Sequence, residues 1–160
     1  NAKKAMKKMV DICKEDNQQI AFTLSDLFCV DRHRDSFSEL IKKNVDILFG
    51  NEEEICAMSQ STSISDGINY AKSLDITTAI TLAERGSLII KNNEVVEIPA
   101  IDVDKVVDTT GAGDLFASGF LYGLCQNKDL ARCGHMASVA AAEIISHYGA
   151  RPLSKLSNLV

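Results

Sequence analysis

The residues best suited to do chemistry form a short loop near the C-terminal end of the chain, DTTGAGD, from Asp108 to Asp114. Gly111 and Gly113 permit backbone conformations that other residues avoid, and with Ala112 they leave no bulky side chain between a ligand and the main chain. The apolar pattern that follows predicts a helix from Gly113 to Gln126, whose free N-terminal N–H groups would point at that ligand. A helix start of this kind favours an anion such as phosphate.

Asp114 is the unexpected member of this loop, because a carboxylate repels phosphate. Acceptance of a proton from an attacking hydroxyl, during transfer of a phosphoryl group, would explain its presence. A plain glycine turn, in which Asp114 interacts favourably with the helix dipole, explains the same residues. The spacing alone leaves both interpretations open.

Two other nucleotide motifs do not fit the loop. A P-loop would end in Gly-Lys-Ser/Thr, which is missing here, and the last glycine of a dinucleotide-binding GxGxxG would fall on Phe116. The sequence therefore disfavours a dinucleotide-binding domain.

Alternating helix and strand patterns precede and follow this loop, within a chain of 160 residues that is long enough for one domain with a core. The 3.6-residue periodicity and the β-rich runs predict elements that we list by range. Helices are predicted at 2–13, at Ser36–Lys43 with a serine cap, at Ser65–Leu74 and at Leu130–Ser146; strands at Ile20–Asp26, Val45–Gly50 and Thr77–Leu82; and a hairpin with an Asn-Asn turn at Ser87–Pro99. This alternation predicts an α/β fold with a mostly parallel sheet and helices on both faces.

Ligands of such folds bind at the carboxyl ends of the strands, in the loops that lead to helices. The polar loops Asn51–Glu54 and Ala83–Gly86 follow two of the predicted strands. We therefore expect these loops and the Asp108–Asp114 loop to converge on one edge of the sheet.

Composition excludes several classes of partner. The chain has 22 Asp and Glu against 17 Lys and Arg, with a net charge of -5, so it lacks the basic surface expected for binding nucleic acid or an anionic membrane. No apolar run is long enough to span a bilayer, and no signal peptide is recognisable. We expect a cytoplasmic protein.

Neither the cysteines nor the histidines indicate a metal site. The five cysteines lack CxxC spacing and are expected to be reduced thiols in the core. Cys133 and His135 are close in sequence, but packing explains them better than metal ligation, and the same holds for His33 and His147.

The segment DTTGAGDLFASGF closely resembles the second signature of the PfkB carbohydrate kinases, a ribokinase-like family that includes adenosine kinase and fructokinase. The resemblance implies a three-layer ribokinase-like fold and transfer of the γ-phosphate of ATP to a primary hydroxyl of a sugar or nucleoside. It further implies that Asp114 is the catalytic base and that the backbone of Gly111, Ala112 and Gly113 forms an anion hole. Asp108 would help to hold a monovalent cation such as K⁺.

Two further segments extend the resemblance. Asn51 and Glu54 match the Asn-x-x-Glu motif of the family, which helps to place Mg²⁺ and the phosphates, and amide and carboxylate groups suit a hard cation. An asparagine helix cap followed by acidic residues would give the same pattern. The segment TLAERG resembles the nucleotide loop TLGxxG, which implies nucleotide contacts by Thr81, Arg85 and Gly86, although Ala83 stands where glycine is usual.

The stretch Met136–Pro152 resembles the closing helix of the family, in which Ser138 would contact the adenine, although an alanine-rich helix suits any core. Leu24–Phe37 is most similar to the adenosine-kinase-like branch. The first family signature and the segments that recognise the substrate are not found in the chain, so we expect the C-terminal part of a kinase. The strand at Ile20 should then have an unpaired edge and an uncovered apolar flank, which favours self-association or a partner segment. The alternative is a non-catalytic nucleotide-binding fragment or regulatory module.

Overall fold

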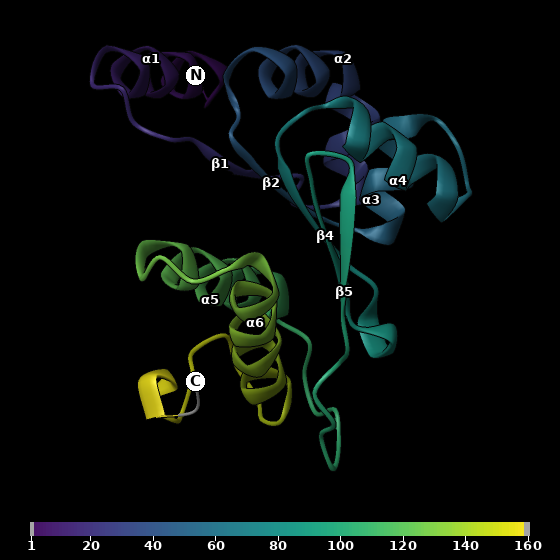
Figure 1. The fold of residues 1–160 in the computed structure, drawn as a ribbon, viewed down its shortest axis with the longest axis vertical. Coiled ribbons are helices and arrows are strands. Elements are labelled where there is room, and N and C mark those ends of the chain that lie inside the picture. The colour runs from purple at the N-terminus through teal and green to yellow at the C-terminus, as the bar shows by residue number, and fades with distance from the viewer. Residues whose placement is uncertain (1, 159–160) are drawn as a thin grey trace. The chain divides into compact units, whose positions relative to one another are not determined.

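A computed structural model describes residues 2–158 of the chain (Figure 1). Helices and strands alternate along most of this range. The α-helices are α1 (Ala2–Glu15), α2 (Leu27–Asn44), α3 (Glu52–Ser59), α4 (Ile64–Ser73), α5 (Ala112–Cys125) and α6 (Leu130–Ile145); the strands are β1 (Ala21–Thr23), β2 (Ile47–Asn51), β3 (Thr77–Thr81), β4 (Ser87–Lys91) and β5 (Glu94–Ile98); and two short 3₁₀ helices are η1 (Ala83–Arg85) and η2 (Leu156–Asn158).

The strands form one five-stranded sheet whose order follows the chain, β1-β2-β3-β4-β5. β1 and β2 pair in parallel, with Ala21 opposite Ile47 and Thr23 opposite Phe49, and α2 connects them as a crossover helix. β2, β3 and β4 are buried along almost their whole length, which is the pattern of strands covered on both faces. The predicted α/β fold with a mostly parallel sheet is confirmed.

The described residues form two compact units, and each is described by itself. The first comprises Asn1–Thr78 and Ile90–Glu94, and the second comprises Ala79–Ile89 and Val95–Val160. Helices α3 and α4 lie side by side in the first unit, and α5 and α6 do so in the second (Figure 1).

In the first unit, α2 begins earlier than predicted. The side chain of Asp26 accepts the N–H of Cys29 at 2.8 Å and caps a helix that starts at Leu27. The predicted cap, Ser36, lies inside this helix, and its hydroxyl instead accepts a hydrogen bond from Lys3 Nζ at 3.2 Å. The prediction of a helix start at Ser36 was wrong, because the helix is already capped upstream by Asp26; a kink at His33 separates the two halves of α2.

β1 lies at the edge of the sheet, as predicted, but its apolar flank is covered. Ile20 and Leu24 are buried, and the half-buried ring of Phe22 packs edge-on against Phe37 with 5.2 Å between centroids. The expectation of an uncovered flank was therefore wrong. The exposed large apolar side chains of this unit lie instead on α1 and at the start of α2: Met6, Met9, Ile12, Leu27 and Phe28.

The predicted hairpin turn between β4 and β5 is confirmed, since Asn92 and Asn93 both have positive φ angles, 51° and 65°, as a type I′ turn requires. Helix α6 ends at Ile145, so the predicted closing-helix segment continues beyond it as turns and bends up to Pro152. Of the cysteines, Cys56 and Cys133 are buried free thiols, whereas Cys125 is exposed, so the expectation that all five lie in the core was wrong. No helix in residues 2–158 combines the length and apolarity needed to cross a membrane.

Helices α5 and α6 approach closely because α5 carries glycine at the contact. A Cβ atom on Gly119 would lie 2.8 Å from the carbonyl oxygen of Met136 and 2.9 Å from the Cα of Ala137. Both neighbours are backbone atoms of α6, so they cannot move without displacing the helix. A side chain on Gly119 would therefore push α5 and α6 apart.

We predict that Gly119→Ala lowers the free energy of unfolding by about 1–3 kcal/mol, the usual cost of overpacking, even though alanine is the better helix former. Urea denaturation followed by circular dichroism measures this change. Gly113→Ala on the same helix is the matched control, because a Cβ there meets no atom within 4 Å. Equal stability of the two variants would contradict the close packing of α5 against α6.

Candidate active site

The glycine loop of the second unit places unpaired donors at the start of α5. Gly111 adopts a left-handed conformation, with φ 84° and ψ 0°, and α5 begins at Ala112, one residue before the predicted start. Among the described residues no acceptor receives the N–H of Gly111, Gly113 or Asp114, whereas the Ala112 N–H donates to Thr109 O at 3.1 Å. Three N–H donors are therefore available to a ligand at this helix start.

Asp114 lies in the first turn of α5 beside these donors, and it is exposed. Its backbone carbonyl accepts the hydroxyl of Ser118 at 2.8 Å, but its carboxylate has no partner among the described residues. Gly113 is exposed as well, and a Cβ there would meet no atom within 4 Å. The backbone at Gly113 is therefore open to a ligand, and the neighbouring carboxylate of Asp114 is exposed.

Asp108, at the other end of the loop, is engaged. Its Oδ1 accepts the N–H of Thr110 at 2.9 Å, and its Oδ2 accepts the N–H of Gly149 at 3.1 Å. The hydrogen bonds of Thr110, followed by that of Gly149, lower the pKa of Asp108, so it is a carboxylate at neutral pH. Within residues 2–158 no three His, Cys, Asp or Glu side chains gather as a metal site.

The predicted nucleotide loop, TLAERG, lies in the same unit between β3 and β4. Thr81 ends β3, Arg85 is exposed in η1, and the Leu82 N–H donates to Gly86 O at 2.8 Å to close the loop. Gly86 has a φ of 87°, and a Cβ on it would lie 2.0 Å from Ile98 O, so only glycine fits. Ala83, which replaces the usual glycine, has a φ of 52° and keeps the left-handed conformation.

Asn51 and Glu54 lie in the first unit, at the carboxyl end of β2. Asn51 Oδ1 accepts the Glu54 N–H at 2.9 Å, Glu54 Oε2 accepts the Asn51 N–H at 2.9 Å, and Asn51 Nδ2 donates to Glu54 Oε1 at 3.0 Å. The two residues form a capping box at the start of α3. The geometry therefore confirms that Asn51 caps a helix with acidic residues in its first turn. The proposed role of Asn51 and Glu54 in placing Mg²⁺ stays a prediction. The convergence of the three polar loops on one edge of the sheet also stays a prediction.

Glu54 is only 5% exposed. Burial is the largest influence on its pKa and raises it; the nearby charges of Asp26 and Glu53 act in the same direction, and the Asn51 N–H opposes them. A carboxylate held in this way costs less to protonate than an exposed one. Protonation of Glu54 should therefore change the free energy of unfolding with pH.

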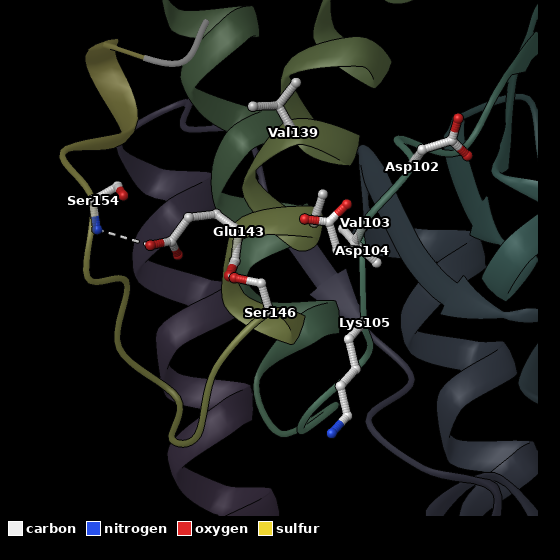
Figure 2. Close-up of a pocket in the computed structure, with 9 residues that line it drawn as sticks. Asp102, Val103, Asp104, Lys105, Val139, Glu143, Ser146 and Ser154 are labelled. Atoms are coloured by element: carbon white, nitrogen blue, oxygen red, sulfur yellow. Dashed lines mark hydrogen bonds between the residues drawn. The ribbon is translucent and has the colours of Figure 1, made fainter.

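A cavity of about 480 Å³ lies in the second unit (Figure 2). The chain segment before the glycine loop forms one wall, and α6 with the residues beyond it forms the other. The lining residues are Asp102, Val103, Asp104, Lys105, Val139, Ala142, Glu143, Ser146 and Ser154. With three carboxylates and one lysine, this lining suits a neutral ligand with hydrogen-bond donors better than a phosphate.

Glu143 holds together the part of this unit that follows α6. Its side chain is 8% exposed, and its Oε1 accepts the N–H groups of Leu153 and Ser154, each at 2.8 Å. Its Oε2 lies 3.4 Å from Nε2 of His147. Burial by itself raises the pKa of Glu143, but the donors of Ser154, His147 and Leu153 lower it overall.

Ser138 is buried in α6 and does not line the cavity, whereas the next residue, Val139, and Ala142 do. Its contact with adenine stays a prediction. Sequence reasoning missed Asp102–Lys105 and Glu143. The alternating acidic residues of the segment IDVDK, directly upstream of the glycine loop, could have indicated Asp102–Lys105.

Comparison with known proteins agrees with the sequence resemblance. The model for the pfkB family of carbohydrate kinases matches residues 1–156, so the chain belongs to this family. An uncharacterized sugar kinase from Archaeoglobus fulgidus is 39% identical over 114 residues, which are 71% of this chain and 45% of that protein.

Two solved structures share the fold closely. A probable sugar kinase from Rhizobium etli superimposes with a TM-score of 0.95 at 40% identity, over 99% of this chain and 48% of that one. An adenosine kinase from Sinorhizobium meliloti gives the same TM-score of 0.95 at 36% identity, over 99% of this chain and 49% of that one. The chain spans less than half the length of each of these three proteins.

We predict that Ala83→Gly raises the free energy of unfolding by about 0.5–1 kcal/mol. Alanine pays a penalty of about 1–2 kcal/mol for a left-handed conformation, which exceeds the extra unfolded-state entropy of glycine. Glu84→Gly, in the same 3₁₀ helix but without a positive φ, is the control and should lower stability. Thermal or urea unfolding measures both variants, and a loss of stability in Ala83→Gly would contradict the described loop.

We predict a pH dependence that belongs to Glu54. Because its folded-state pKa lies above the ordinary value near 4.5, the folded chain holds this proton more tightly than the unfolded chain. Its contribution to stability is therefore complete below pH 4.5 and is lost as the pH rises through the raised folded-state pKa. Glu54→Gln does not titrate, so the free energy of unfolding of the native chain should fall relative to this variant as the pH rises from about 4.5 through the raised folded-state pKa. If the free energies of unfolding of the native chain and of Glu54→Gln instead change in parallel with pH, burial does not raise the pKa of Glu54.

Proposed function

We propose that the chain forms the nucleotide-binding and catalytic part of an ATP-dependent kinase that phosphorylates a primary hydroxyl of a sugar or nucleoside. The observation that carries this proposal is the start of α5, where three N–H donors adjoin a carboxylate and none of these groups has a partner in residues 2–158. Membership of the pfkB family supports it. A non-catalytic nucleotide-binding module would need the donors but not the free carboxylate.

The donors suit the transferring phosphoryl group. Charge on the equatorial oxygens of that group is stabilised by fixed N–H dipoles, and a helix N-terminus supplies these without reorganisation. The N–H groups of Gly111 and Gly113 and that of Asp114 are available, and the N–H of Ala112 would have to leave Thr109 to join them. We therefore propose that the N–H groups of Gly111, Gly113 and Asp114 form the anion hole, with the N–H of Ala112 as a further donor.

Asp114 is proposed to be the general base. Its carboxylate has no partner among the described residues to release before it accepts a proton from the phosphoryl acceptor. Loss of that proton as the oxygen attacks the γ-phosphorus makes the hydroxyl a better nucleophile. The leaving group is the nucleoside diphosphate.

The cavity lined by Asp102 and Glu143 is proposed to take the base of the nucleotide. Its acidic lining disfavours the phosphates, whereas carboxylate and hydroxyl oxygens accept hydrogen bonds from an exocyclic amino group such as that of adenine. Thr81, Arg85 and Gly86 are proposed to contact the rest of the nucleotide. Ser138, which is buried in α6, is proposed to contact the adenine.

Two cations are part of the proposal. Mg²⁺ would neutralise the phosphates, and since both oxygens of Glu54 accept hydrogen bonds from Asn51, these two residues would act on it through bound water. The oxygens of Asp108 keep lone pairs beyond the two N–H bonds that they accept, which fits a role beside K⁺.

The phosphoryl acceptor is proposed as a nucleoside or sugar, since the similar solved structures include an adenosine kinase and a probable sugar kinase. Self-association is also proposed, through the open edge of β1 and the exposed Met6, Met9 and Ile12. A cytoplasmic location stays a prediction.

We predict that Asp114→Asn, in the natural polypeptide that contains this chain, lowers kcat by roughly 10²–10⁴-fold and leaves ATP affinity unchanged or slightly tighter. The variant loses the base and also a negative charge beside the phosphates. Coupled assays measure turnover, and calorimetry with Mg-ATP measures affinity.

Asp129→Asn is the matched control, because this aspartate caps α6 through the Arg132 N–H and lies at the other end of the α5–α6 pair. Because asparagine caps a helix about as well as aspartate, Asp129→Asn should change stability little and should leave kcat unchanged. Full turnover in Asp114→Asn would contradict the role of Asp114 as general base and would leave it only a favourable interaction with the helix dipole. Binding of NAD as tightly as ATP, without an effect of Mg²⁺, would contradict the kinase proposal itself.

A further inference from the structure

The segment that follows α6, His147–Ser154, has no regular secondary structure, and most of it is exposed. We call it the C-terminal strap. An exposed segment without its own backbone hydrogen bonds keeps one position only if the rest of the protein fixes it. The fixing contacts come from two carboxylates, those of Glu143 and Asp108.

Glu143 fixes both ends of the C-terminal strap. It accepts the N–H groups of Leu153 and Ser154 at one end and contacts the His147 ring at the other. Figure 2 shows the side chain of Glu143 directed toward Ser154. Hydrogen bonds to a carboxylate are charge-assisted, and a nearly buried one is poorly replaced by water.

The middle of the C-terminal strap lies against the glycine loop. Gly149 donates its N–H to Asp108, which also binds the Thr110 N–H, and a Cβ on Gly111 would lie 3.0 Å from the Cβ of Ala150. The backbone of Gly111, the first residue with an available N–H, therefore packs directly on the strap. Displacement of the strap would release Gly111 from this contact.

We propose that Glu143 is a positioning residue, which holds the C-terminal strap against Gly111 and so fixes the N–H donors that bind the phosphates. This inference rests on the proposed function. Glu143 also lines the cavity proposed for the base. One carboxylate would therefore contribute to the cavity for the base and also hold the N–H donors for the phosphates in position. Its removal should weaken nucleotide binding without removing any group that we assign to the phosphates.

The test compares Glu143→Ala with Glu143→Gln, which keeps an oxygen that can accept the Leu153 and Ser154 N–H groups. Hydrogen exchange of the Gly149 and Ser154 amides reports on the strap, and calorimetry of Mg-ATP reports on binding. We expect Glu143→Ala to speed exchange at both amides and to weaken ATP binding by about 10-fold, in the range known for residues that orient other ligand-binding groups. Glu143→Gln should restore both within about threefold, because one oxygen still accepts both N–H groups.

Glu97→Ala is the control for loss of charge, since Glu97 is exposed on β5 and should change neither readout. Unchanged exchange at Gly149 in Glu143→Ala would overturn the inference, whatever the chain binds. Faster exchange with native ATP affinity would also overturn it, because the role of Glu143 would then be structural only. A native chain that binds no ATP would instead overturn the proposed function, while the exchange measurement still decides whether Glu143 fixes the strap.

Discussion

The left-handed conformation of Gly111 is the constraint on which the candidate site depends. It leads the chain into α5, where the N–H groups of Gly111, Gly113 and Asp114 have no acceptor among the described residues, and it brings the Gly111 backbone against Ala150. Any other residue at this position would have to accept a positive φ and a contact at 3.0 Å. The same feature therefore explains the loop, the unpaired donors and the dependence on the segment beyond α6.

Carboxylates do two different jobs in this chain. Asp26 caps α2, Glu54 closes the capping box of α3 and Asp129 caps α6, each by accepting backbone N–H groups. Asp108 and Glu143 accept N–H groups from the segment after α6 in the same way. Asp114 differs from these, since its carboxylate binds no described residue although it stands at a helix start where such bonds are readily made. A group left free in that position is available to a substrate.

Local patterns were sufficient where the structure depends on neighbouring residues. The Asn92–Asn93 turn, the strands around Ile47 and Thr77, and the start of α5 within one residue all followed from periodicity and turn chemistry. The start of α2 did not, because two polar residues, Asp26 and Ser36, both suit a cap and only tertiary contacts decide between them.

The wall of the cavity was also beyond sequence reasoning. Asp102 and Glu143 are 41 positions apart, and only the packing of the fold places them around one space. The fixing of Gly149 by Asp108 spans a similar separation. Periodicity reports which face of an element is buried, but it carries no information on which distant carboxylate the backbone will meet.

The central claim is that the start of α5 binds phosphate through its own N–H groups. Titration of the ¹⁵N-labelled chain with Mg-ADP, followed by amide chemical shifts, tests it most directly. The account predicts that the largest shifts fall on the amides of Gly111, Gly113 and Asp114. Saturable binding that leaves these three amides unchanged, with shifts confined to other residues, would contradict it.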